Sequence, residues 1–317
     1  QPGSVFKPFI YLTALEQGYT TTTELLNQPL VVFIDDTTRW NPQNHDGSTG
    51  LLTSLRDGLR RSLNLISVRV VQELISPTDV KNTAERLGIN SRIRAVDAIA
   101  LGVSEVSPLN ITMSYSAIAN NGILNNPMSI TSIKDNNGRT IKEFISNSKE
   151  VADEKEIFIL RDMMKSVIDS GTGGSLRWKY KFYAPAAGKT GTTNSKTDAW
   201  FIGFTPYITI GVWVGIDDPQ MKLGEKQYGS NAALPIFAKA INEIYSLGNY
   251  YYLGNPIEIS KKEDWTTPDG IVEKNICKET CCLSTDWCDS YKEYFTYTNI
   301  PRDECEEFSN PLFRFKK

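Results

Sequence analysis

The chain has 317 residues, of which 40% are hydrophobic and 22% are charged, a balance typical of a globular protein and not of a disordered or fibrous one. Its net charge of −3 offers no basic surface for nucleic acid. The longest strongly apolar stretch, residues 207–216, is too short to cross a bilayer. The single histidine, His45, excludes a multi-histidine metal centre and favours a different base for any nucleophilic chemistry.

The N-terminal segment is predicted to be a helix followed by a loop. Apolar residues recur at helical spacing over 3–19, which predicts a helix that begins near Ser4 and ends at Gly18. Residues 40–50 are dense in Asn, Gly, Pro and Asp and predict a loop. We expect the histidine of this loop to be solvated and not to touch a substrate.

The next part of the chain is predicted to be mostly helical. Residues 51–75 have a helical pattern that Gly58 and the Ser-Leu-Asn step at 62–64 should break into two pieces. Helical spacing continues over 80–125. We therefore expect a mostly helical subdomain over about 20–125.

The pattern changes to strands after a further helix. A polar, hairpin-like section at 129–145 precedes a predicted helix at 156–169. Residues rich in β-branched and aromatic side chains then predict adjacent antiparallel strands, at 188–193, 198–206 and 207–217. An amphipathic helix at 231–247 should cover this sheet. The expected fold class is α/β (α+β), an antiparallel sheet with helices on both faces.

The composition shifts near residue 248, which predicts a main domain over 1–247 and a tail over 248–317. All five cysteines lie in this tail. Their spacing lacks the paired C-x2-C steps of zinc sites, so we expect disulfides and no metal, with Cys288 and Cys305 as the favoured pair. Because five is odd, at least one cysteine should remain free or pair with another chain.

The first of three chemically suggestive motifs is Ser4-x-x-Lys7. At the start of a helix this spacing places the hydroxyl and the amine one turn apart on the same face, where the amine can take the hydroxyl proton. The helix N-terminus adds free N–H groups that suit a developing oxyanion. A second S-x-x-K, Ser146 to Lys149, has no comparable surroundings, so the motif alone is a weak signal.

The other two motifs are Ser62-Leu63-Asn64 and the run from Lys189 to Thr193, Lys-Thr-Gly-Thr-Thr. The Ser and Asn can supply a proton relay and an amide that holds a substrate carbonyl. The Lys and Thr side chains of the second run suit a carboxylate, and its glycine lets a substrate backbone approach closely. Taken singly, each also fits ordinary polar surface.

The three motifs in this order resemble the penicillin-recognising serine acyltransferases, that is, the penicillin-binding proteins and serine β-lactamases. The surrounding sequence, with QPGSVFKPF, WNPQNHDGSTG, RRSLN and GKTGTTNSKTDAWFIGFTP, resembles the transpeptidase domain of the bifunctional class A penicillin-binding proteins over most of 1–247. In that family, strands of the sheet precede the S-x-x-K helix, so the N-terminal strands are expected to be missing and the domain to be truncated.

The resemblance implies catalytic roles for residues of the first two motifs. Ser4 would be the nucleophile that attacks the penultimate D-Ala carbonyl of a peptidoglycan stem peptide and forms an acyl-enzyme. Lys7 would accept the Ser4 proton, and Ser62 would relay a proton to the leaving amine. Asn64 would hold the substrate amide, and the N–H groups of Ser4 and Thr192 would form the oxyanion hole.

The third motif would bind the substrate's terminal carboxylate through Lys189, Thr190 and Thr192, with Gly191 and Thr193 completing this edge of the site. No cofactor is implied. The implied partners are stem peptides ending in D-Ala-D-Ala and β-lactam antibiotics. The parent chain would be membrane-anchored, with an upstream glycosyltransferase domain, and located in the cell envelope at the outer face of the cytoplasmic membrane.

Two other functions remain open. A serine β-lactamase of class A needs a Glu in an E-x-x-L-N stretch, but Glu105 lies one residue too far from Asn110 and Val106 takes its place. A β-lactam sensor or non-catalytic scaffold would keep the penicillin-binding residues and not turn over. The complete set of motif residues favours the D,D-transpeptidase over either alternative.

Overall fold

The computed structural model describes most of the chain. The described residues are 1–33, 39–45, 47–193, 197–216, 218, 221–252, 255–286 and 288–305. Asp46 of the predicted loop, the end of the predicted strand 207–217, and residues 306–317 of the tail lie outside them. None of the described helices is long and apolar enough to cross a membrane.

Helices outnumber strands among the regular residues of the N-terminal third, and further helices follow along the chain. The helical elements are η1 (Gly3–Phe6), α1 (Lys7–Glu16), α2 (Leu55–Arg60), α3 (Asn64–Arg69), η2 (Val70–Leu74), α4 (Pro77–Arg86), η3 (Asp97–Leu101), α5 (Pro108–Ala119), α6 (Glu154–Ser170), α7 (Ser175–Trp178) and α8 (Leu234–Leu247). The predicted helices at the N-terminus, at 156–169 and at 231–247 are therefore confirmed as α1, α6 and α8.

The strands form one three-stranded sheet and several two-stranded pairs. They are β1 (Glu24–Leu26), β2 (Val32–Phe33), β3 (Arg39–Trp40), β4 (Leu52–Ser54), β5 (Ile123–Asn125), β6 (Ser132–Lys134), β7 (Thr140–Glu143), β8 (Ser148–Glu150), β9 (Ala187–Thr192), β10 (Asp198–Phe204), β11 (Thr209–Gly215), β12 (Asn249–Tyr252), β13 (Asn255–Glu258), β14 (Ile271–Cys277) and β15 (Ser290–Thr296).

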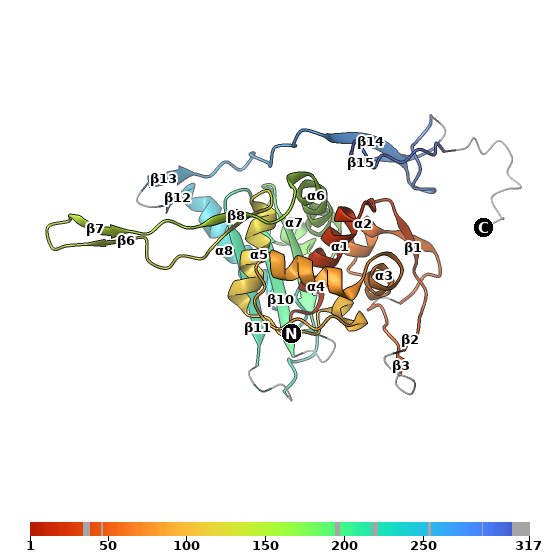
Figure 1. Cartoon of the computed structure of the whole chain (residues 1–317), viewed down its shortest axis with the longest axis horizontal. Helices are drawn as coiled ribbons and strands as arrows, with labels where there is room; N and C mark the ends of the chain where they lie inside the picture. The colour runs from red at the N-terminus through yellow and green to blue at the C-terminus, as the bar shows by residue number, and fades with distance from the viewer. Residues whose placement is uncertain are drawn as a thin grey trace, which may run out of the picture.

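The main sheet has the antiparallel order β11-β10-β9, as predicted. Its central strand alternates between two hydrophobic clusters, because successive side chains of a strand point to opposite faces. Trp200, Ile202 and Phe204 belong to the cluster that contains α1 and α5. Phe201 faces the other way and packs on Phe237 of α8, with ring centroids 4.8 Å apart. Helices thus cover both faces of the sheet (Figure 1).

The predicted helix at 51–75 is only partly confirmed. Its first residues form β4, which pairs with β1, and Ser54 then caps α2 by accepting a hydrogen bond from the Asp57 N–H. The break between α2 and α3 falls at the Ser-Leu-Asn step as expected. Gly58, in contrast, does not break the helix. A Cβ at this position would lie 2.6 Å from Ile66 and 2.7 Å from the Tyr11 hydroxyl, so the glycine permits close packing between helices.

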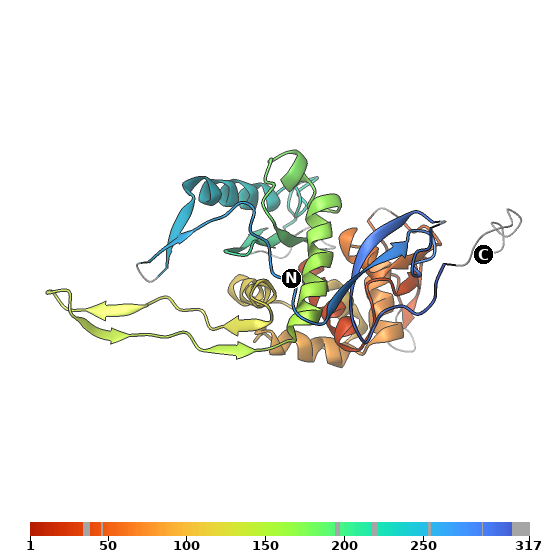
Figure 2. The ribbon, with the colours of Figure 1, turned by 90° about the horizontal axis from the view of Figure 1, so that it is seen from above.

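A long arm leaves the body between α5 and α6. The predicted hairpin is confirmed, with β6 paired to β7 at its tip and β5 paired to β8 at its base. The arm projects away from the helices in both views (Figure 1 and Figure 2).

The segment after α8 returns across the helical side of the molecule. The β14–β15 hairpin, blue in the figures, lies beside α2 and α6 (Figure 2). Trp265, ahead of the hairpin, donates its indole N–H to the Ala119 carbonyl at 2.8 Å and packs against Phe204. The tail therefore packs on the main core, and the domain boundary near 248 stays a prediction.

Candidate active site

Ser4 lies at the start of the first helix, where a short 3-10 turn leads directly into α1. The turn is packed closely against its neighbours. Gly3 has φ +55°, and its N–H donates to the Gly102 carbonyl at 3.2 Å. Gly102 itself has φ +65°. Both residues adopt the left-handed backbone region that favours glycine, so these two positions fix where Ser4 is presented.

The turn that carries Ser4 also packs on the outer edge of β9. A Cβ added to Gly3 would lie 2.7 Å from the Thr192 carbonyl oxygen. A Cβ added to Gly191 would lie 2.8 Å from the Pro2 carbonyl oxygen. Neither contact leaves room for a side chain. Glycine at both positions is therefore what lets the first and third motifs approach each other backbone to backbone.

The second motif joins the site through the side chain of Lys7. This amine donates to the Ser62 carbonyl oxygen at 2.7 Å and to the Asn64 Oδ1 at 2.9 Å, and it lies 3.4 Å from the Ser62 hydroxyl. Ser62 has φ +59°, a conformation that is uncommon for a residue with a side chain. The strained turn between α2 and α3 directs both its carbonyl and its hydroxyl toward the amine.

The third motif reaches the same hydroxyl from the sheet. Lys189 Nζ donates to the Ser62 Oγ at 2.7 Å and to the Thr190 carbonyl at 3.1 Å. The Ser62 hydroxyl thus lies between two lysine amines that come from α1 and β9. A hydroxyl in that position can accept a proton from one amine and donate to the other.

Burial sets the charge state of the two amines. Lys7 and Lys189 are both fully buried. Burial disfavours the charged ammonium and lowers the pKa of Lys189 to about 7. Burial, with repulsion from Lys189 as a second cause, lowers the pKa of Lys7 well below its ordinary value. Both amines donate to carbonyl, amide and hydroxyl oxygens, and within the described part of the chain no carboxylate pairs with either of them to counteract these shifts. Both shifts favour the neutral, proton-accepting form of the amines.

The remaining residues of the third motif occupy different positions. Thr190 shares a 2.6 Å hydroxyl contact with Thr172. Thr193 lines the cleft, but its hydroxyl accepts the backbone N–H of Asp198 at 3.1 Å and is engaged in the turn to β10. The Thr193 N–H points toward β10 and donates to the Asp198 carbonyl. Because the N–H groups of successive strand residues point in opposite directions, the Thr192 N–H points toward the other edge of β9, where η1 packs. That N–H therefore lies on the side of Ser4.

The motif residues surround one cleft of about 460 Å³. Its lining residues are Ser4, Gln43, Asn44, His45, Arg61, Ser62, Asn64, Leu101, Thr172, Thr190, Gly191, Thr192, Thr193, Tyr228 and Ser230. The cleft lining thus includes seven of the nine predicted site residues. The other two, Lys7 and Lys189, lie beneath it and bond to its wall.

Sequence reasoning missed several lining residues. His45 is exposed, as expected for a solvated loop residue, but its ring also lies 5.1 Å from the Tyr228 ring and lines the cleft. Nothing in the pattern around Tyr228 marked it. Asn44 accepts the Leu65 N–H at 3.0 Å and so ties the loop to α3. The polar loop composition predicted only that no regular element forms there, not that the loop folds over the motifs.

The competing motif does not line this cleft. Ser146 donates to the Asn126 carbonyl at 2.8 Å, and Lys149 is exposed in β8 on the arm. Glu105 is exposed and is absent from the described lining of the cleft. The structure therefore separates the first S-x-x-K from the second by its surroundings alone.

Comparisons with known proteins agree with this geometry. The family model described as the penicillin binding protein transpeptidase domain matches residues 1–242. Penicillin-binding protein 1A of Rickettsia typhi is 36% identical over 269 residues, which cover 77% of this chain and 34% of that protein. Penicillin-binding protein 1A of Aquifex aeolicus is 31% identical over 316 residues, covering 98% of this chain and 40% of its own. The chain spans between about a third and two fifths of the length of these relatives.

Solved structures share the fold. The crystal structure of penicillin-binding protein 1A from Haemophilus influenzae superposes with a TM-score of 0.85 at 26% identity, over 96% of this chain and 49% of that one. PonA1 from Mycobacterium tuberculosis, solved in complex with penicillin V, shares the fold with a TM-score of 0.69 at 22% identity, over 84% of this chain and 71% of its own. The predicted fold class is confirmed. The chain belongs to the penicillin-binding protein transpeptidase domain family.

Proposed function

We propose that the chain is a serine D,D-transpeptidase that cross-links peptidoglycan stem peptides through an acyl-enzyme and is acylated by β-lactams. One observation carries the proposal. The Ser62 hydroxyl lies 2.7 Å from one buried amine and 3.4 Å from another, beside a cleft that Ser4 lines. Buried lysines held without a carboxylate partner are the groups that can exchange protons with a serine nucleophile at neutral pH.

Acylation would use the Lys7 amine and then the Ser62 hydroxyl. Neutral Lys7 would take the proton of the Ser4 hydroxyl as the oxygen attacks the carbonyl of the penultimate D-Ala. Collapse of the tetrahedral intermediate breaks the peptide bond to the terminal D-Ala. The Ser62 hydroxyl would give its proton to the leaving amine and take one from the Lys7 ammonium, which returns Lys7 to the neutral form. Ser4 then carries the acyl group as an ester.

The oxyanion of the intermediate would be held by the backbone N–H groups of Ser4 and Thr192. The support is that the Thr192 N–H points to the edge of β9 on which η1 packs. Loss of one such donor costs about 3 to 4 kcal/mol in other enzymes of this type. The backbone contact through Gly3 and Gly191 would therefore serve catalysis by keeping the two donors in register.

The terminal carboxylate of the substrate would lie against the third motif. Lys189 would pair with it as an ammonium, and the hydroxyls of Thr190 and Thr192 would donate to it. Asn64 has its Oδ1 bound to Lys7 and its amide nitrogen bound to the Gln43 carbonyl at 2.8 Å, which fixes the side chain at the cleft wall. From there it would hold the substrate amide.

Transfer to an amine, and not hydrolysis, is supported by the cleft lining. In the part of the chain that the structure describes, the lining contains no Asp or Glu that could activate a water molecule for deacylation. Val106, which takes the place of the β-lactamase glutamate, packs against the core. An acceptor amine of a second stem peptide would bring its own nucleophile and complete the cross-link.

The setting of the whole protein is part of the proposal. The relatives of this chain are penicillin-binding proteins 1A that extend well beyond it. By that likeness we place the parent chain in the cell envelope, with its transpeptidase domain at the outer face of the cytoplasmic membrane. An upstream membrane anchor and a glycosyltransferase domain would complete it.

The direct test is the intact mass of the chain after incubation with benzylpenicillin, followed over hours. We expect one stable adduct of one penicillin mass, and its absence in Ser4→Ala. Ser146→Ala removes the serine of the second S-x-x-K and is the matched control, because it should acylate like the parent chain.

Each alternative has its own outcome in this test. An adduct that disappears while free penicillin is hydrolysed would overturn the transpeptidase in favour of a β-lactamase. Stable acylation without transfer of a D-Ala-D-Ala stem peptide to an amine acceptor would identify a sensor. No adduct in a folded sample, judged by circular dichroism, would exclude Ser4 as the nucleophile.

A further inference from the structure

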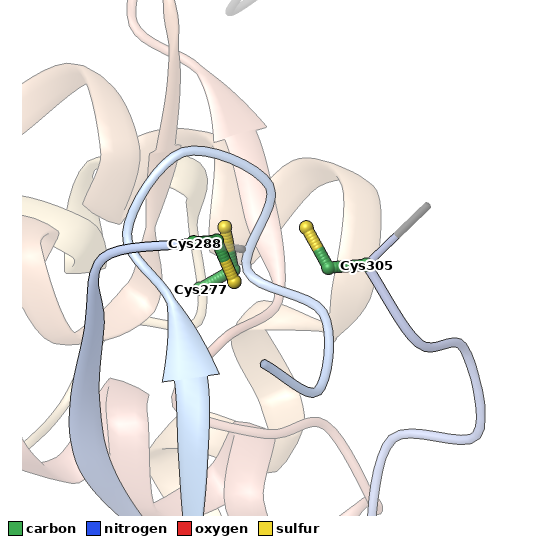
Figure 3. A group of neighbouring side chains, drawn as sticks. All are labelled: Cys277, Cys288 and Cys305. Atoms are coloured by element: carbon green, nitrogen blue, oxygen red, sulfur yellow. The ribbon is translucent and has the colours of Figure 1, made fainter. Parts of the chain in front are cut away.

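Three of the tail cysteines meet at one point. Cys277 ends β14, Cys288 precedes β15, and Cys305 follows β15. Their sulfur atoms all lie within 4.8 Å of one another (Figure 3). Cys277 and Cys305 are buried, and all five cysteines are free thiols. The predicted Cys288–Cys305 disulfide is therefore not formed in this structure, although the two side chains are neighbours.

The backbone holds the three segments together independently of the sulfurs. The Cys277 N–H donates to the Cys282 carbonyl at 2.9 Å, and the Cys305 N–H donates to the Leu283 carbonyl at 2.9 Å. Leu283 also forms isolated bridges with Ile276 and with Glu304. One short segment thus pairs with the end of β14 on one side and with the chain after β15 on the other. The thiols converge because the fold brings them together.

The turn after Cys277 directs hydrogen-bond donors at its sulfur. The Thr280 hydroxyl and the backbone N–H groups of Glu279 and Thr280 form hydrogen bonds with this sulfur. The Thr280 hydroxyl also lies 3.6 Å from the Cys305 sulfur. Such donors stabilise a thiolate, the form in which cysteine binds a metal.

We propose that Cys277, Cys288 and Cys305 form a three-thiolate site for a soft divalent cation, zinc being the natural probe, with water in the fourth position. A metal ion can bind all three thiolates, whereas a disulfide would use two of the thiols and leave the third without a bonding partner. The group of three therefore fits a metal better than a disulfide. With Zn–S bonds of about 2.3 Å, tetrahedral ligands lie roughly 3.8 Å apart, so sulfurs within 4.8 Å need only a small contraction. A disulfide needs a contraction to about 2 Å.

The lack of C-x2-C pairs in the sequence does not exclude this site, because three separate segments of the tail each supply one ligand. Binding would replace three thiol protons by one cation and so cross-link β14, the approach to β15 and the chain after it. Glu293 of the same hairpin forms a salt bridge with Arg56 of α2. By stabilising the hairpin, the metal would also stabilise the packing of the tail against α2.

The test uses the full chain, freshly reduced and then freed of reductant under nitrogen. Titration with zinc, followed by native mass spectrometry, should give one zinc per chain. Cobalt(II) in its place should give a thiolate-to-metal charge-transfer absorption. Cys305→Ser and Cys288→Ser should each abolish stoichiometric binding. Cys282→Ser is the matched control, because this neighbouring cysteine lies outside the group of three, and it should bind as the parent does.

Other results overturn the proposal. A reduced, folded parent chain that binds no zinc excludes the site, and so does a Cys282→Ser variant that loses zinc as completely as Cys305→Ser. A mass two hydrogens lower in the untreated protein, with two of the three cysteines cross-linked in peptides and no zinc bound after mild reduction, identifies a disulfide instead. The cobalt spectrum of the parent chain decides the matter even if a serine variant fails to fold. Benzylpenicillin acylation is read separately and does not enter this test.

Discussion

Two groups of buried charge in this protein are built in opposite ways. Under the cleft, Lys7 and Lys189 both contact the Ser62 hydroxyl, and among the described residues they donate to uncharged oxygen atoms. On the far side of α2, Arg56 donates to Glu293 through Nε at 2.6 Å and to Asp162 through Nη2 at 2.6 Å. The hydrogen-bond acceptors of the two lysine amines are uncharged, whereas the positive charge of the arginine is balanced by two carboxylates.

The difference is visible in the pKa values. Burial lowers the pKa of Lys7 and of Lys189, because nothing nearby favours their ammonium forms. For Arg56, burial also acts to lower the pKa, but attraction to Glu293 and Asp162 outweighs it, and the pKa is raised. An uncompensated buried amine is expensive to charge and is therefore available as a base. A compensated guanidinium is permanently charged and holds segments together.

Two helices connect these groups. α2 carries Arg56 on one side and leads into Ser62 at its end. α6 carries Asp162, and the turn after it supplies Thr172, whose N–H donates to the Arg60 carbonyl at 3.3 Å. A Cβ at Gly171 would lie 2.3 Å from that same carbonyl, so the two helix ends pack without room for a side chain. The tail anchor and the cleft are thus fixed to the same pair of helices.

The largest effect is expected from Lys7→Met. Removal of the base should lower the second-order rate of acylation by benzylpenicillin about 10³-fold, within the range for general-base catalysis. The free energy of unfolding should not fall, because a buried amine is replaced by an apolar chain of similar length. Stopped-flow acylation and urea denaturation measure the two effects. Lys149→Met, on the exposed arm, is the control, and a Lys7→Met variant that acylates normally would contradict the assignment.

Glu293→Gln should show the reverse behaviour. Removal of one carboxylate from the buried group leaves Arg56 undercompensated and should cost about 3 kcal/mol of unfolding free energy. The acylation rate of the folded fraction should stay within about twofold of the parent, since the change lies outside the cleft. Urea denaturation gives the stability. The exposed Glu273→Gln, on the paired strand, should change it little. Equal losses in both variants would show that the buried group is not a special anchor.

The pH dependence of acylation tests whether Lys189 acts as a charged ammonium. Its pKa of about 7 means that the ammonium which pairs with the drug's carboxylate is present below pH 7 and lost above it. The second-order rate constant reports the free enzyme, so it should fall about tenfold per pH unit above that value. Lys189→Arg keeps the charge and should remove this alkaline limb. A rate that continues to rise to pH 9 would contradict a role for the charged lysine.

The smallest effect is expected from Thr172→Val, which keeps the volume and removes the hydroxyl that contacts Thr190 at 2.6 Å. One hydrogen bond of this kind contributes about 1 kcal/mol, so acylation should slow about fivefold. The effect should appear in the apparent dissociation constant of the drug and not in the limiting rate. Thr140→Val, on the exposed arm, is the control. No change in Thr172→Val would show that Thr190 keeps its position without this contact.

Much of the fold follows from local pattern. The β-branched and aromatic residues of 198–206 predict a strand, and the structure shows β10 with Trp200 and Phe201 in different clusters. The predicted helix end at Gly18 agrees with its positive φ. Gly58 was misread because propensity treats a helical glycine as a weakness. Here its missing side chain is what α1 and α3 need in order to pack, and only the packed structure reveals that.

Some residues of the candidate site could likewise be predicted from local sequence, and others could not. The three motifs name the nine predicted residues because their spacing is short and their order is specific. His45 and Tyr228 could not be found by spacing, since they meet only when the loop and the segment before α8 fold over the cleft. Arg56 and Glu293 are also out of reach for a local pattern, because 237 residues separate them in the sequence.

By itself, then, the sequence indicated the candidate residues of the site, where the main helices and the antiparallel strands form, and which family the motifs resemble. The tertiary structure decided the pKa shifts of the buried lysines and which distant side chains contact one another. A lysine becomes a base only when burial removes its water and no carboxylate replaces it, and three cysteines become one group only when distant segments converge. Both are properties of the packed interior, where the solvation of each group depends on neighbours that the linear order does not specify.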